Sequence, residues 1–129
     1  QIPQMRSGGG GTILNVSSMA GLGAAPKAAT YAAAKHAIVG LTKTAAFEYA
    51  RDNVRVNAIC PFFTMTEMLT EIGSGSGIDD INAFLGRGTP MRRVGRPEEI
   101  VNVMLMMISP GNTFMNGQAI AVDGGSSAI

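Results

Sequence analysis

The chain has 129 residues, of which 46% are apolar and 15% are charged, and this suits the core of one domain. Its net charge of +1 argues against a nucleic-acid partner, and no run reaches the about eighteen apolar residues of a membrane span. The single cysteine excludes an internal disulfide, and no signal-peptide layout opens the chain, so we expect a cytoplasmic location.

The first clear element is a short strand. Gln1–Gly11 has the pattern of a helix tail that runs into a glycine turn, and Thr12–Val16 is an apolar, β-branched run. Such a run is too short for a stable helix and favours a strand buried on both faces of a sheet. Ser17 and Ser18 follow directly, which puts two hydroxyl groups at the carboxyl end of this strand, where open parallel sheets bind their ligands.

A long helix is expected next, over residues 30–52. It should begin near Thr30, whose hydroxyl is a suitable N-cap, and it is apolar on nearly all sides. Tyr31 and Lys35 are four residues apart and therefore project from one face of this helix. An ammonium group one helical turn from a phenol favours the ionised phenol, so the pair suits proton transfer. The ordinary alternatives are a turn-forming pair of serines and a solvent-exposed Tyr–Lys face.

The rest of the chain again alternates strands with helices. Val54–Ile59 and Gln118–Val122 predict two further strands, and Ile78–Leu85 predicts a short helix. Pro97 suits the first turn of a last helix. Strands that alternate with helices predict an α/β fold whose adjacent strands are parallel.

These motifs together resemble the later part of a classical short-chain dehydrogenase/reductase. That family has a Tyr followed four residues later by Lys, with a Ser thirteen residues before the Tyr, and Ser18, Tyr31 and Lys35 have this spacing. The resemblance implies an oxidoreductase that transfers hydride between NAD or NADP and an alcohol or carbonyl substrate. It also implies that Tyr31 exchanges a proton with the substrate and Ser18 hydrogen-bonds the same oxygen. Lys35 would support Tyr31 and hold the nicotinamide ribose.

A second stretch resembles the family's cofactor-binding turn. Asn57-Ala58-Ile59-Cys60-Pro61 matches the end of the next strand, and the resemblance implies that Pro61, Thr64 and Thr66 contact the cofactor. Phe62 replaces the usual glycine. An aromatic residue would be strained there if the position required a positive φ, and would otherwise narrow the nicotinamide end of the pocket.

The first half of the family's domain has no counterpart in this sequence. Family members carry a glycine-rich turn after their first strand, a residue that selects NAD or NADP, and an Asn-Ala-Gly motif, and none of these is found. Gly8–Gly11 precede a strand, whereas a phosphate-binding loop follows one. We therefore expect residues 1–129 to form the catalytic, latter half of a Rossmann-like doubly wound sheet, with about three parallel strands. The first residue, Gln1, also suggests a fragment, and such a fragment should aggregate or exchange strands through its free edge.

The resemblance also suggests partners. Residues 64–89 correspond to the family's variable lid over a small-molecule substrate, and the helix over residues 30–52 to its homo-oligomer interface, in a dimer or tetramer. No metal site is expected, because His36 has the pattern of a surface residue and Cys60 that of a small buried hydrophobe. Two alternatives stay open. One is a non-catalytic fragment or structural subunit without a dinucleotide site, and the other is an epimerase or dehydratase of the same fold.

Overall fold

A computed structural model of the chain describes residues 1–67, 69, 71 and 80–128. In chain order its elements are α1 (Ile2–Ser7), β1 (Gly11–Val16), η1 (Met19–Gly21), α2 (Ala29–Tyr49), η2 (Ala50–Asp52), β2 (Val54–Pro61), α4 (Ile81–Gly86), α5 (Pro97–Ile108) and β3 (Ala119–Val122). The three predicted strands and the predicted helices are confirmed, with ends that differ by a few residues. The glycine and serine stretch at residues 73–77 lies outside the described part of the chain.

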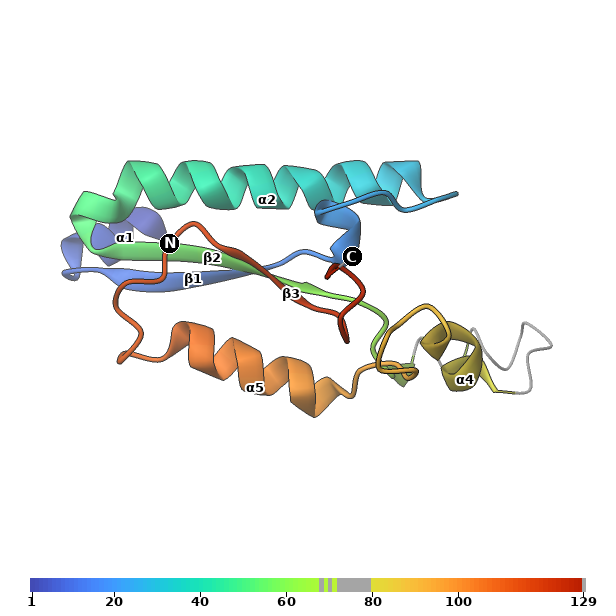
Figure 1. Cartoon of the computed structure of the whole chain (residues 1–129). Coiled ribbons are helices and arrows are strands. Elements are labelled where there is room, and N and C mark those ends of the chain that lie inside the picture. Colours follow the sequence, from blue (N-terminus) through green and yellow to red (C-terminus); the bar gives the residue numbers. More distant parts are fainter. Residues whose placement is uncertain (68, 70, 72–79, 129) are drawn as a thin grey trace.

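The strands form one parallel sheet in the order β1-β2-β3. β1 pairs with β2 from Gly11 opposite Val54 to Val16 opposite Ile59, and β3 pairs with the second half of β2. Helix α2 lies along one face of this sheet and α5 along the other (Figure 1). This is the expected latter half of a doubly wound α/β fold, with all strands ending toward the same edge.

Two small cores hold the layers together, one on each face of the sheet. Ala45 and Ala46 of α2 pack with Val54 and Val56 of β2 on the first face. On the second face, Ile59 of β2 packs against two α5 side chains, Ile100 and Met107. The central strand therefore supplies apolar side chains to both cores, as a fully covered parallel strand does.

The start of α2 differs from the prediction. The N-cap is Ala28, which makes no side-chain cap, and Thr30 already lies inside the helix. Lys27 has a positive φ of 64°, and this turn directs the chain into the helix before Thr30. Further along, Leu41 and Phe47 are 64% and 89% exposed, so a large apolar part of α2 faces away from the sheet.

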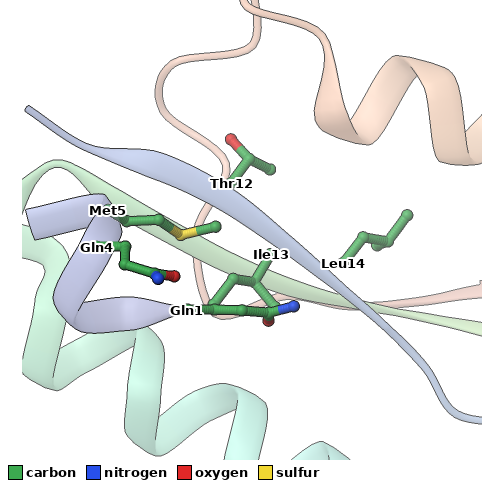
Figure 2. A pocket seen from close by; sticks show the side chains of 6 residues that line it. All are labelled: Gln1, Gln4, Met5, Thr12, Ile13 and Leu14. Atoms are coloured by element: carbon green, nitrogen blue, oxygen red, sulfur yellow. The ribbon is translucent and has the colours of Figure 1, made fainter. Parts of the chain in front are cut away.

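Strand β1 is not buried on both faces, as its apolar run predicted, but it has the free edge that was expected of a fragment. Its residues are half-buried up to Val16, which is 50% exposed, because within the described residues β1 pairs with β2 alone. A cavity of about 460 Å³ lies beside it, lined by α1 and β1 residues (Figure 2): Gln1, Gln4, Met5, Thr12, Ile13 and Leu14.

No helix in the described residues is long and apolar enough to cross a membrane.

Two polar side chains of β2 hold the segment that leads into β3. The buried Asn57 amide donates to Met115 O and accepts from Gln118 N, both at 2.9 Å. Arg55 donates to the carbonyl oxygens of Met107, Ser109 and Met115 at 3.2–3.4 Å, and to Thr12 Oγ1 at 2.9 Å. Arg55 thus satisfies carbonyl groups at the carboxyl-terminal end of α5, where a positive charge is favourable.

The amino-terminal end of α5 is held by a carboxylate. Pro97 occupies the first turn as predicted, and Glu99 accepts from the Arg96 backbone N–H at 2.8 Å. Arg93 donates to both Glu99 oxygens, at 2.7 and 2.8 Å. These contacts, above all the hydrogen bond from Arg93, lower the pKa of Glu99 to about 2. Arg93, Arg96 and Glu99 thus form an exposed ion-pair cluster.

Candidate active site

The candidate site lies where β1 and β2 end side by side. Val16 is opposite Ile59, and the backbone N–H of Ser17 donates to Ile59 O at 2.9 Å, which extends the pairing by one residue. The segment after β1 then turns into the short helix η1, which packs against α2. The predicted hydroxyl groups are therefore delivered to the carboxyl edge of the sheet, beneath the first turns of α2.

Tyr31 and Lys35 share one face of α2, as their spacing predicts. The Lys35 ammonium nitrogen lies 5.5 Å from the centre of the Tyr31 ring. The same nitrogen donates to Val16 O at 3.2 Å, so it also reaches the end of β1. Tyr31 is 49% exposed, which leaves its phenol open to a ligand.

Ser18 caps η1. Its Oγ accepts a hydrogen bond from the backbone N–H of Ala20 at 3.2 Å, and its backbone is extended. The hydroxyl hydrogen is not used in that bond and can be donated to another oxygen. Only Ser17 separates Ser18 from Val16, whose carbonyl Lys35 contacts, so the structure brings Ser18 into the same region as Lys35.

Ser17 is a residue for which the sequence analysis gave no role. It is only 4% exposed, and its Oγ donates to the backbone carbonyl of Lys35 at 2.9 Å. Gly21 packs against this contact, because a Cβ there would come within 2.6 Å of Lys35 O. The sequence does show Ser17 at a strand end with Gly21 one short turn later. It does not show that Ser17 contacts Lys35 in α2, because no spacing rule links the two residues.

Cys60, near the end of β2, lies beneath these groups. Burial raises the pKa of its thiol, and this is opposed by contacts with the Ser17 side chain, the Ser18 backbone and the Lys35 charge. The raised pKa means that the thiol is the form present at neutral pH. Cys60 is therefore a buried apolar neighbour of the site, as predicted.

The segment after β2 is held on two sides. The Phe62 backbone N–H donates to Val122 O at 3.1 Å, and Thr64 forms a parallel bridge with Gly95. Phe62 is not among the described non-glycine residues with positive φ, so the aromatic side chain carries no left-handed strain. Its ring lies 4.6 Å from that of Phe63, centre to centre.

The three residues predicted to contact a cofactor lie along this segment. Pro61 is the last residue of β2. Thr64 Oγ1 donates to Phe62 O at 3.1 Å, and Thr66 Oγ1 accepts from the backbone N–H of Leu69 at 3.4 Å. Next to them is a cavity of about 340 Å³, lined by Met65, Asn82, Arg93, Val94, Gly95 and Arg96. The larger cavity beside β1 is away from these residues.

The groups at this edge are of the kinds that exchange protons and hydrogen-bond an oxygen atom. They are a phenol, an ammonium and a serine hydroxyl at one edge of a parallel sheet, and these are the groups that acid–base catalysis at a carbonyl or alcohol requires. The described residues contain no cluster of metal-binding side chains.

Comparisons with known proteins agree with this geometry. Residues 1–127 match the family model described as enoyl-(acyl carrier protein) reductase. The chain is 41% identical over 125 residues to an A-factor type gamma-butyrolactone 1'-reductase of Streptomyces virginiae, covering 97% of this chain and 48% of that protein. It is 39% identical over 127 residues to the 3-oxoacyl-[acyl-carrier-protein] reductase FabG of Thermotoga maritima, covering 96% and 48%.

A solved structure, that of ElxO with NADP bound, superposes with a TM-score of 0.93 at 28% identity, covering 99% of this chain and 51% of that one. The chain thus spans about half the length of the relatives and of the structure that it matches. The match of the family model and of these relatives over nearly all of this chain shows its family. The chain belongs to the short-chain dehydrogenase/reductase family.

Proposed function

We propose that the natural protein carrying this chain is an NAD(P)(H)-dependent oxidoreductase that interconverts an alcohol and a carbonyl, with Tyr31 as the general acid and base. One observation carries the proposal: the Lys35 ammonium lies over the Tyr31 ring and also contacts the end of β1, at Val16 O. A single cation therefore links the phenol to the strand end from which Ser18 extends.

NAD(P) supplies the acceptor or donor of the hydride. The described residues fit its nicotinamide and ribose end, because Lys35 offers a cation and Thr64 and Thr66 offer hydroxyl groups at the same sheet edge. Gly8–Gly11 do not form a phosphate cradle, since they lead from α1 into β1, whereas such a loop leads from a strand into a helix. Pro61, at the end of β2, directs the chain into the segment that carries both threonines.

In alcohol oxidation, the C–H bond of the carbinol breaks and its electron pair leaves with the hydride, while the O–H proton passes to the Tyr31 phenolate. In reduction, the same proton is returned to the carbonyl oxygen. Ser18 donates a hydrogen bond to that oxygen as negative charge develops on it. Lys35 stabilises the phenolate by its charge. The lid that the resemblance assigns to residues 64–89 falls in part on residues outside the described part of the chain. The exposed apolar part of α2 pairs with a second copy in a homo-oligomer.

The test is Tyr31→Phe in the natural protein, with Tyr49→Phe as the matched control. Tyr49 is on the same helix but packs on the first core. Tyr31→Phe should lower kcat by about 10²–10⁴-fold, the usual contribution of a general acid or base. NADH and NADPH binding, followed by cofactor fluorescence, should be unchanged. The substrates are a panel of secondary alcohols and β-keto thioesters, each with both cofactors.

Three results would contradict the proposal. Equal activity of Tyr31→Phe and wild type would remove Tyr31 from the reaction. Binding of neither cofactor would favour a structural subunit. Conversion of substrate without net oxidation or reduction of the cofactor would favour an epimerase or dehydratase.

A further inference from the structure

Ser17 joins three elements at one point. Its backbone N–H donates to Ile59 O, which fixes it to β2, and its Oγ donates to Lys35 O, which fixes it to α2. Lys35 in turn donates from its ammonium to Val16 O. Two hydrogen bonds therefore connect Lys35 with Val16 and Ser17, one through its side chain and one through its main chain.

Gly21 makes this close contact possible. A Cβ at this position would overlap with Ser17 Oγ and approach Lys35 O to 2.6 Å and Lys35 C to 2.9 Å. Real Cβ atoms essentially never come so close, so a side chain here would force η1 and α2 apart. Gly21 has no positive φ, so it is the space and not the backbone conformation that requires glycine.

We propose that Ser17 and Gly21 are positioning residues that act through Lys35, holding its helical turn against the end of β1 so that the ammonium stays beside Tyr31 and Ser18. This inference rests on the proposed function, because it concerns the same site. Neither residue touches the reacting atoms. The backbone carbonyl of Lys35 is the point at which both act.

Loss of the Ser17 hydroxyl releases one of the two links. The turn that carries Lys35 can then move away from β1, and a displacement of about 1 Å at a site of this kind costs up to about 10²-fold in rate. A more distant ammonium stabilises the Tyr31 phenolate less. The pH at which alcohol oxidation is half-maximal should therefore move upward, which a general loss of stability would not cause.

The experiment compares Ser17→Ala with Thr42→Val in the natural protein. Thr42 is also a buried hydroxyl that joins α2 to β1: it accepts from the Asn15 side-chain amide at 2.9 Å and donates to Ile38 O at 2.8 Å, but it lies about two helical turns from Lys35. Both variants should lose stability. Only Ser17→Ala should lower kcat by about 10-fold or more and shift the pH profile of oxidation upward by about half a unit, as expected if the charge has moved. Ser17→Thr, which keeps the hydroxyl, should restore the wild-type profile.

Gly21→Ala and Gly23→Ala form a second matched pair. Gly23 lies two residues further along, and a Cβ there has open space within 4 Å. Gly21→Ala should reproduce the effect of Ser17→Ala or exceed it, whereas Gly23→Ala should have wild-type kinetics.

The inference is wrong if Ser17→Ala keeps the wild-type kcat and pH profile, or if Thr42→Val shifts the profile equally. These outcomes leave the proposed function intact when Tyr31→Phe is inactive. Wild-type protein that oxidises no alcohol of the panel and reduces no ketone overturns both.

Discussion

Replacing Asn57 by leucine tests whether a side chain holds the third strand in place. The Asn57 amide is 1% exposed and bonds both Met115 O and Gln118 N, on either side of the turn before β3. Leucine fills a similar volume but can make neither bond. Met115 O keeps the hydrogen bond from Arg55 at 3.2 Å, so the Gln118 N–H is the group that loses its partner.

The cost of Asn57→Leu follows from the two hydrogen bonds that are lost. The Gln118 N–H is left without an acceptor and Met115 O loses one of its two donors, which together lower the free energy of unfolding by about 2 kcal/mol. For the 129 residues of this chain, this corresponds to a fall in Tm of about 7 °C. Urea unfolding measures the energy, and hydrogen exchange should quicken at the Gln118 amide. Asn102→Leu, an exposed asparagine of α5, is the control. If the two variants unfold at the same urea concentration, the Asn57 amide does not hold β3.

Three further predictions concern α5 and the exposed face of α2. Arg93→Met removes the paired hydrogen bonds to Glu99, whose pKa is lowered to about 2 from 4.5. The stability difference from wild type should thus be full above pH 4.5 and disappear toward pH 2, and a pH-independent difference in urea unfolding would contradict this. Arg55→Met should cost about 2 kcal/mol and quicken hydrogen exchange in the last turn of α5, whereas unchanged exchange there would assign the carbonyl groups another partner. Phe47→Asp places a charge on the exposed apolar part of α2, so light scattering should report a smaller particle than wild type; an unchanged mass would separate this surface from any subunit interface.

Much of the fold was predictable because its signals are local. The β-branched runs located all three strands, and Pro97 located the first turn of α5. The fixed spacing of Ser18, Tyr31 and Lys35 located the candidate site. In each case residues close together in the sequence carry the pattern.

The features that were missed depend on contacts between distant residues. Asn57 and Arg55 reach carbonyl groups more than fifty residues away, and no pattern in β2 indicates which ones. The N-cap of α2 was predicted at Thr30 but is Ala28, because the chain turns at Lys27, and lysine is not a residue type that favours positive φ. The burial of β1 was overestimated because an apolar run does not say whether a neighbour covers it.

The two ends of α5 are secured by chemically different means, and acid should separate them. A carboxylate anchors the first turn and is neutralised as protons accumulate. The Arg55 guanidinium group, which donates to carbonyl oxygens, anchors the last turn without any carboxylate. On acidification, the first turn of α5 should therefore loosen while its last turn stays attached to β2.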